Sequence, residues 1–100
     1  MASRFARQFR THHWSGQRMP HVFFDPRALA TDDTSAVLHA KCVVVDSALA
    51  FVTSANFTES AHRRNIEAGV LVRSAQFALG LVRQFDQLVS AGVVVRVPGI

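Results

Sequence analysis

The chain has very little cysteine and no long apolar stretch. Cys42 is its one cysteine, so no internal disulfide can form. It lies inside the run KCVVVD, where we expect a small buried side chain and not a reactive thiol. No stretch approaches the roughly 18 apolar residues of a transmembrane helix, and the basic residues 1–14 lack the apolar region of a signal peptide. The expected location is the cytoplasm.

A cysteine pair is also missing, which argues against a zinc site. His12, His13 and His21 are candidate ligands, but adjacent histidines point in different directions and no pair of cysteines accompanies them. No metal and no cofactor is expected.

Lysine is scarce as well. Ten arginines and Lys41 supply the positive charge against seven acidic residues, which gives a formal net charge of +4. Arginine suits bidentate recognition of phosphate, although a solvated surface is the alternative for any single arginine. Arg63 and Arg64, for example, either contact a polyanionic substrate or lie at a solvated helix end. The balance as a whole favours an anionic partner, either nucleic acid or lipid headgroups.

The length and composition favour one small globular domain. A chain of 100 residues buries about 60–65% of its unfolded surface, so the core is expected to be thin. Hydrophobic residues make up 49% of the chain and charged residues 18%, which argues against disorder. The patterns divide the chain into an N-terminal part, residues 1–35, with a short helix, a short strand and a loop, and a C-terminal part, residues 36–100.

Two helices are expected. Phe5 and Phe9 are four residues apart among arginines, which predicts an amphipathic helix over residues 3–14. The apolar residues at 77, 81, 85 and 88 predict a second helix, with Ser74 as its N-cap and Gly92 as its C-terminal stop.

The strand patterns predict an α/β fold. Turn-forming Asp46 and Ser47 join two apolar runs into a hairpin, and CVVV is apolar at consecutive positions, as in a sheet covered on both faces. Strands are expected at residues 21–25, 37–45, 49–52, 65–72 and 93–97, with a polar loop at 31–36. We therefore expect a mixed sheet flanked by helices.

A histidine and the only lysine stand two residues apart at the head of one strand. Side chains two apart on a strand project from the same face, so His39 and Lys41 are expected side by side. Imidazole can attack phosphorus, and an ammonium balances charge on the non-bridging oxygens. The pair outlines a phosphate site, and the alternative is a strand-end lysine that reaches solvent.

Polar residues repeat this spacing after the next strand. The hydroxyl of Ser54 and the amide of Asn56 can donate hydrogen bonds to phosphate, or the two can be turn residues. Glu67 lies within the apolar third strand and needs a donor there, for which the ring of His39 is the candidate. A carboxylate that faces water is the alternative.

Together these residues resemble a known signature. The pattern His-x-Lys-x4-Asp is similar to the HKD signature of the phospholipase D superfamily, and further polar residues follow it in register. The full set is His39, Lys41, Asp46, Ser54, Asn56 and Glu67. The resemblance implies a half-domain of the phospholipase D type.

The resemblance also implies roles. The catalytic set would be His39, Lys41, Asp46 and Glu67, with His39 as nucleophile or leaving-group acid, Glu67 orienting it and Asp46 closing the strand. Lys41, Ser54 and Asn56 would bind the phosphate.

The chain departs from the pattern at one position. The family commonly has glycine before the serine, and this chain has Thr53, whose bulk narrows the pocket.

A longer stretch resembles a narrower group. Residues 20–90, which include FFDPRAL and the stretch from LHAKCVVVD to GVLVRS, are similar to the phospholipase D-like component of the DISARM anti-phage system, DrmC. This implies a prokaryotic defence setting with nucleic acid as the substrate. A phospholipid, as for a cardiolipin synthase-like enzyme, is the alternative.

One HKD copy is half of a catalytic site. The family brings two copies together, so a second His39 is expected from a homodimer, or a second histidine from a missing N-terminal half. The chain resembles the C-terminal half of a longer enzyme. The alternatives are a non-catalytic fragment or interaction module, and an electrostatic binder of nucleic acid.

Overall fold

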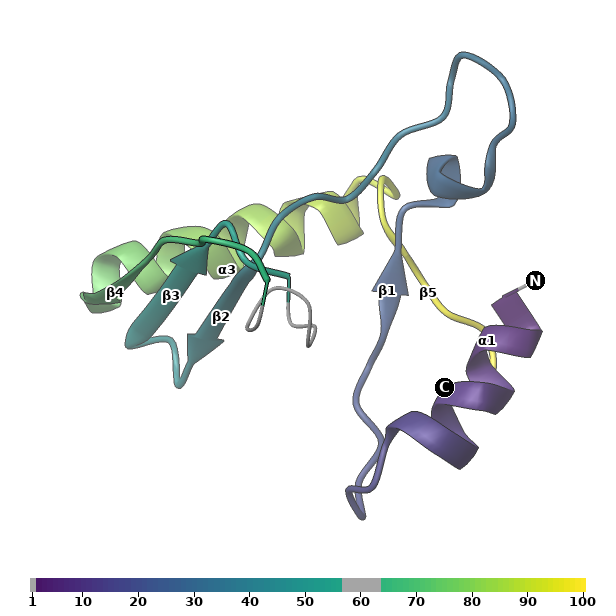
Figure 1. The fold of residues 1–100 in the computed structure, drawn as a ribbon, viewed down its shortest axis with the longest axis horizontal. Coiled ribbons are helices and arrows are strands. Elements are labelled where there is room, and N and C mark those ends of the chain that lie inside the picture. The colour runs from purple at the N-terminus through teal and green to yellow at the C-terminus, as the bar shows by residue number, and fades with distance from the viewer. Residues whose placement is uncertain (1, 57–63) are drawn as a thin grey trace. The chain divides into compact units, whose positions relative to one another are not determined.

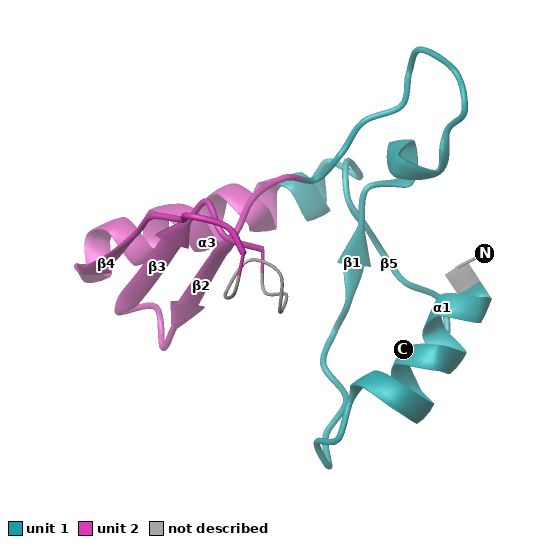
Figure 2. Ribbon diagram, in the orientation of Figure 1, with its two compact units in different colours: residues 1–38, 88–100 teal, residues 39–87 magenta. Residues whose placement is uncertain are grey.

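The chain folds into two compact units. A computed structural model describes residues 2–56 and 64–100 (Figure 1). Unit 1 comprises residues 1–38 and 88–100, and unit 2 comprises residues 39–87 (Figure 2). The division expected from the sequence falls after residue 35 and groups residues 88–100 with the second part. The structure instead groups them with unit 1, because a strand near the C-terminus pairs with one near the N-terminus.

Unit 1 begins with a helix. Helix α1 (Ala2–Gln8) continues into a wider π-helical turn (Phe9–His13), and the two together cover most of the helix expected at residues 3–14. Further along, Pro26–Leu29 form a single 3-10 turn that the sequence patterns did not predict. Asp25 caps this turn by accepting a hydrogen bond from the backbone N–H of Arg27 at 3.0 Å.

The strands of unit 1 are short. Strand β1 (Phe23–Phe24) pairs antiparallel with strand β5 (Val95–Arg96), and the N–H of Val97 extends the pairing to the carbonyl of Val22 at 2.8 Å. Both strands lie inside the longer ranges expected at 21–25 and 93–97.

The core of unit 1 is small. Ala6, Val97 and Ile100 are buried, and Phe9 packs against them, so the inner face of the first helix is committed to this core. Phe5, the other member of the expected aromatic stripe, stays 45% exposed.

Unit 2 contains a three-stranded antiparallel sheet. Strands β2 (Cys42–Val45), β3 (Leu49–Thr53) and β4 (Gly69–Arg73) are hydrogen-bonded in that order. The expected hairpin is confirmed: Asp46 and Ser47 have φ of +54° and +51°, and the N–H of Ala48 donates to the carbonyl of Val45. Two positive φ angles define a type I′ turn, whose twist matches that of the strands it joins.

Helix α3 (Ala75–Ser90) follows the sheet. Its expected boundaries are confirmed, since the hydroxyl of Ser74 accepts the N–H of Phe77 at 3.2 Å and Gly92 adopts a φ of +74° after the last turn. Between those boundaries Ala78 is fully buried.

The two faces of the sheet have different surroundings. Cys42 and Val52 line a hollow together with Leu81 and Phe85 of α3, and their neighbour Ala50 is fully buried.

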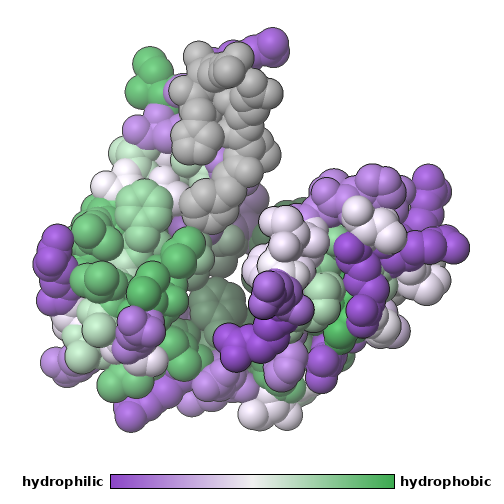
Figure 3. Space-filling model, turned by 90° about the horizontal axis from the view of Figure 1, so that it is seen from below, coloured by the Kyte–Doolittle hydropathy of each residue, from purple (hydrophilic) through white to green (hydrophobic). Residues whose placement is uncertain are grey.

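Side chains on the opposite face are open to solvent. The exposed fractions are 44% for Val43, 48% for Val45, 37% for Phe51 and 54% for Leu71. Val43, Phe51 and Leu71 are paired across the strands, and Val45 follows Val43 on the same face. Figure 3 shows hydrophobic residues gathered on the surface of unit 2.

The α/β class is confirmed, and two details differ. Both sheets are antiparallel in the described part of the chain, where a mixed sheet was expected. Within residues 39–56 and 64–87, one sheet face lacks the expected cover, because α3 packs on the other face alone. The apolar run CVVV was expected to be covered on both faces of the sheet, but its residues alternate between half-buried (Cys42 and Val44) and exposed (Val43 and Val45).

Candidate phosphate site

Five of the residues expected in the site collect at one end of the sheet of unit 2. In an antiparallel sheet the start of β2, the end of β3 and the start of β4 share an end. The residues next to these three strand ends are His39, Lys41, Ser54, Asn56 and Glu67. The topology therefore brings together residues that span 29 positions of the sequence, from 39 to 67.

His39 and Lys41 contact one another directly. Nζ of Lys41 lies 2.8 Å from Nδ1 and 3.2 Å from Nε2 of His39, and it donates to the backbone carbonyl of His39 at 2.9 Å. His39 and Lys41 both precede β2. The N–H of Thr53 donates to the carbonyl of Lys41, so the pairing of β2 with β3 extends as far as Lys41. The prediction that the two side chains stand side by side is confirmed.

The ammonium lies against the face of the imidazole ring. A donor aligned with one ring lone pair in the ring plane would stand far from the other nitrogen, whereas Nζ is within 3.2 Å of both. A cation over an aromatic face is attracted electrostatically. The side chain of His39 is itself exposed to solvent.

Ser54 is fixed to the segment before β4. Its hydroxyl donates to Oε2 of Glu67 at 2.5 Å and accepts the N–H of Ala68 at 3.2 Å, while its own N–H donates to the carbonyl of Ala68. These bonds continue the β3–β4 ladder by one residue beyond Thr53 and hold Glu67 at the sheet end. The role of Ala68 is carried by backbone atoms, so no side-chain pattern could have revealed it.

The partner of Glu67 differs from the expected one. The sequence analysis paired its carboxylate with the ring of His39, whereas the structure pairs it with the hydroxyl of Ser54. Within the described residues, no ion pair between Glu67 and His39 forms. The reason is register: Ser54 lies directly across from Ala68, one residue from Glu67, whereas His39 approaches from β2, two strands away from β4.

Thr53 stands where the family commonly has glycine, and its surroundings accommodate it. Its hydroxyl donates to the carbonyl of Ala68 at 3.2 Å and accepts the N–H of Ala55 at 3.0 Å. Directly across the strands lies Gly69, where an added Cβ would meet Cβ of Thr53 and Cζ of Phe51 at 3.0 Å. A glycine opposite Thr53 therefore makes room for the bulk that was expected to narrow the pocket.

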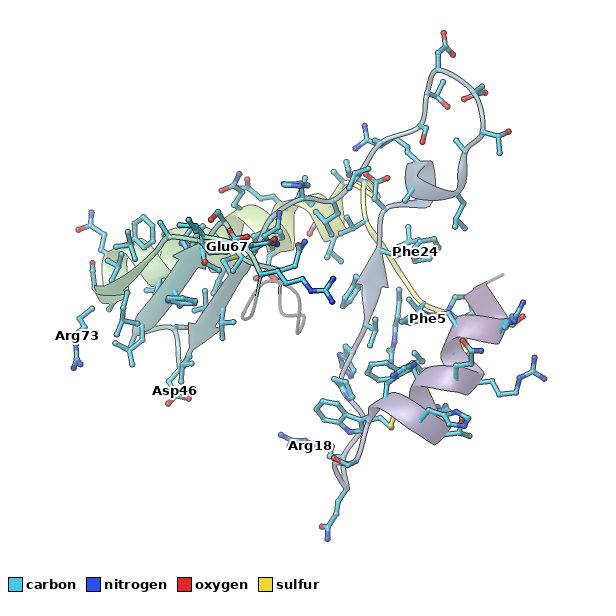
Figure 4. The ribbon with its side chains drawn as sticks, viewed as in Figure 1. Phe5, Arg18, Phe24, Asp46, Glu67 and Arg73 are labelled. Atoms are coloured by element: carbon cyan, nitrogen blue, oxygen red, sulfur yellow. The ribbon has the colours of Figure 1, made fainter. Side chains whose placement is uncertain are left out.

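Asp46 lies away from the other expected catalytic residues. It begins the turn between β2 and β3, at the end of the sheet opposite to Glu67 (Figure 4). The structure gives it the backbone conformation of a type I′ turn, which agrees with the strand-end role that the resemblance also implied, and its membership of the catalytic set stays a prediction.

The site is open to solvent. His39, Ser54, Asn56 and Glu67 are exposed and Lys41 is half-buried. Beside Lys41 lies a hollow of about 200 Å³ between β2, β3 and α3, with Gln84 as its polar member from the helix. Gln84 was not singled out from the sequence, since a lone glutamine in a helix carries no motif.

Some expected contributors lie outside this group. Arg64 is exposed and Arg63 lies outside the described residues, so their contact with a substrate stays a prediction. Among residues 2–56 and 64–100, no three His, Cys, Asp or Glu side chains are placed to hold a metal ion. No helix in the same part of the chain is both long enough and apolar enough to cross a membrane.

Comparison with protein families shows which family the chain belongs to. The model described as cardiolipin synthase, PLD-like domain, matches residues 7–89. The chain belongs to this PLD-like family. The match covers the whole sheet end described above and supports the phosphodiesterase superfamily for the chain. Neither a curated protein nor a solved structure matches it.

Proposed function

We propose that this chain provides one half of a phosphodiesterase site that cleaves a nucleic acid backbone through a phosphohistidine intermediate, in a prokaryotic anti-phage setting of the DISARM type. The observation that carries the proposal is the contact between Nζ of Lys41 and the ring of His39. A nucleophilic nitrogen and a fixed cation are within reach of the same phosphorus atom only when they stand this close.

The reaction follows from those two groups. A ring nitrogen of His39 attacks phosphorus, the P–N bond forms, and the bond from phosphorus to the leaving oxygen breaks. The leaving oxygen takes a proton from an acid on a second half-site. That group, now a base, later takes a proton from water as the water oxygen attacks phosphorus, the P–N bond breaks, and both the imidazole and the acid are restored. Lys41 stabilises the negative charge on the non-bridging oxygens throughout.

The remaining polar residues position the substrate. Asn56 and Ser54 supply neutral donors for the phosphate oxygens. Glu67 holds the Ser54 hydroxyl in place, so it positions a phosphate donor and not the ring of His39.

A second half-site completes the proposal. The side chains at this sheet end are exposed to water, which weakens their electrostatic interaction with a phosphate. A partner that excluded water from them would strengthen that interaction. A second HKD half, from a homodimer or from an N-terminal half of a longer chain, would supply both the cover and the second histidine.

The test is cleavage of a generic diester, bis(4-nitrophenyl) phosphate, and of a labelled oligonucleotide by the purified chain. His39→Ala should abolish both activities without changing the circular dichroism spectrum, while the control His21→Ala, in unit 1, should leave them intact. Acid-labile, alkali-stable phosphate should be trapped on wild type and not on His39→Ala. Undiminished cleavage by a folded His39→Ala dimer contradicts the mechanism.

Two other functions have support from specific observations. The matched family is described by cardiolipin synthase, which favours a phospholipid substrate, and turnover of phospholipid vesicles without oligonucleotide cleavage would select it. The openness of the site favours a non-catalytic interaction module. A monomer in size-exclusion chromatography with no diesterase activity would select that function.

A further inference from the structure

The net charge of the chain is concentrated at its start. Residues 1–24 contain four arginines and no aspartate or glutamate, which accounts for the whole formal charge of +4. The remaining residues contain seven basic and seven acidic side chains. Such a segment creates a local positive potential although the rest of the chain is balanced.

The arginines of this segment are available to a ligand. Arg4, Arg7 and Arg18 are exposed, and the acid nearest in sequence, Asp25, already forms an ion pair with Arg27 at 2.7 Å. Within residues 2–56 and 64–100, that pair is the one salt bridge of the structure. Arg7 and Arg10 also line a hollow of about 490 Å³ beside Gly99, whose carbonyl accepts Nε of Arg10 and so orients its guanidinium.

A row of aromatic rings continues from the helix into the loop that follows. The ring centroids of Phe5 and Phe9 are 5.8 Å apart, and those of Phe9 and Trp14 are 6.0 Å apart, both stacked. Trp14 ends the row and is 39% exposed. Figure 4 labels Phe5 on α1 and Arg18 on the loop that follows, and in the sequence the three rings alternate with Arg4, Arg7 and Arg10.

The indole of Trp14 is held in one orientation. Its Nε1 donates to the carbonyl of Arg18 at 3.0 Å. The turn between them passes so close to the ring that a Cβ on Gly16 would meet indole atoms at 2.8–2.9 Å. A fixed aromatic face beside exposed guanidinium groups is the combination that binds single-stranded nucleic acid, where bases stack and phosphates pair with cations.

The packing of the helix argues against a lipid surface as the ligand. A membrane-bound amphipathic helix buries its apolar face in the bilayer. Here Ala6 is 4% exposed, and Phe9 packs on Val97 and Ile100, so the apolar face already belongs to the core of unit 1. The helix would have to leave that core in order to insert.

We infer that residues 3–18 form a contact surface for single-stranded nucleic acid, on which Arg4, Arg7 and Arg18 bind phosphates and Trp14 stacks against a base. The inference rests on the proposed function for its choice of nucleic acid as ligand, and it adds a binding surface in unit 1 to the catalytic residues of unit 2. The surface binds backbone and base faces without sequence preference.

The first experiment measures binding of a fluorescent 15-nucleotide DNA strand at several salt concentrations, in the His39→Ala background so that no cleavage intervenes. Arg4→Gln with Arg7→Gln should weaken binding about tenfold and lower the slope of log Kd against log salt by about 1.4, since each single-strand phosphate contact contributes about 0.7. The control Arg73→Gln with Arg83→Gln removes the same charge from unit 2 and should change the slope by less than half as much. Equal effects of the two pairs overturn the inference.

The second experiment uses the fluorescence of Trp14, the one tryptophan of the chain. The DNA strand should quench it, and Trp14→Leu should weaken binding about tenfold, whereas Phe77→Leu, an exposed aromatic on α3, should not. Gly16→Ala, which displaces the ring, should reduce the quenching while leaving the salt slope in place. Binding of phosphatidylglycerol vesicles with a blue shift, and no binding of DNA, overturns the inference.

These outcomes separate this inference from the proposed function. Salt-dependent DNA binding and quenching without any cleavage by wild type would support the contact surface and contradict the phosphodiesterase. Cleavage that depends on His39, with no effect of the arginine or tryptophan substitutions on DNA binding, would support the phosphodiesterase and contradict the contact surface.

Discussion

The two units position their polar residues in different ways. In unit 2 a regular antiparallel sheet collects His39, Lys41, Ser54 and Glu67 at one end, with hydrogen bonds that fix their neighbours. In unit 1 the arginines lie on one short helix and a loop, and the sheet is a pair of two-residue strands. Covalent chemistry needs atoms placed to a fraction of an ångström, which a strand register provides, whereas attraction of a polyanion tolerates looser placement.

The units also differ in what covers their apolar residues. Unit 1 closes the inner face of α1 over Val97 and Ile100. Unit 2 packs α3 on part of one sheet face, where Ala50 is buried and Val70 stays exposed, and leaves Val43 and Leu71 on the other face in solvent. We propose that chemistry resides in unit 2 and nucleic acid binding in unit 1, and substitutions in the two units should therefore affect different measurements.

The largest effect is expected for Lys41→Ala. Loss of the cation beside the ring of His39 should lower kcat for diester cleavage by about 10²–10³-fold, as for loss of one preorganised donor to a developing anion. Binding of the DNA strand should change less than threefold, because the expected binding surface lies in unit 1. Arg83→Ala, on α3, is the matched control and should retain activity. A Lys41→Ala variant that loses binding and not turnover would reverse the roles of the two units.

Gly69→Ala should destabilise the sheet that positions the site. The new methyl would meet Thr53 Cβ and the Phe51 ring at 3.0 Å, so we expect the free energy of unfolding in urea to fall by about 1–3 kcal/mol, as for an overpacked site. Gly80→Ala is the contrasting substitution. It lies inside α3 with nothing within 4 Å of the added atom and should raise that free energy by about 0.5–1 kcal/mol. If both substitutions changed the free energy of unfolding in the same direction, the space opposite Thr53 would not be what requires glycine at position 69.

Ser54→Ala should have a moderate effect on stability. The hydroxyl bonds to Glu67 and Ala68, so its loss should lower the free energy of unfolding by about 1 kcal/mol. A double-mutant cycle with Glu67→Gln should give a coupling of about 0.5–1 kcal/mol, whereas Ser90→Ala at the end of α3 should stay within about 0.5 kcal/mol of wild type. A vanishing coupling would mean that Ser54 and Glu67 act independently.

The smallest effect is a pH dependence located in unit 1. Hydrogen bonds from Arg27 lower the pKa of Asp25 below its ordinary value. Because the folded-state pKa is the lower one, the stabilisation by this pair is complete above the unfolded value, about 3.9, and is lost as pH falls through the folded value. Asp25→Asn should therefore flatten the acid limb of stability between pH 2 and 5 in urea unfolding, and Asp86→Asn should keep it. Carboxyl chemical shifts of Asp25 that titrate at or above the ordinary range would contradict the pairing.

Much of the fold follows from short-range patterns. The turn at Asp46 and Ser47, the cap at Ser74 and the stop at Gly92 depend on neighbouring residues in the sequence, and all appear where expected. Strand ends were less predictable: apolar residues favour extended backbone from Val37, but β2 begins only at Cys42, and its pairing with β3 extends no further than the carbonyl of Lys41. A strand ends where its partner ends, and composition does not report that.

For the site, the sequence alone determined the contact of His39 with Lys41, because two residues of extended chain place two side chains on one face whatever surrounds them. It also determined the positive charge of the first 24 residues. Only the tertiary structure decided that Glu67 meets Ser54, that Asp46 lies at the far end of the sheet, and that residues 95–96 pair with residues 23–24. Those contacts join distant positions through the register of neighbouring strands, and register is set by the packing of the whole sheet and not by any local run of residues.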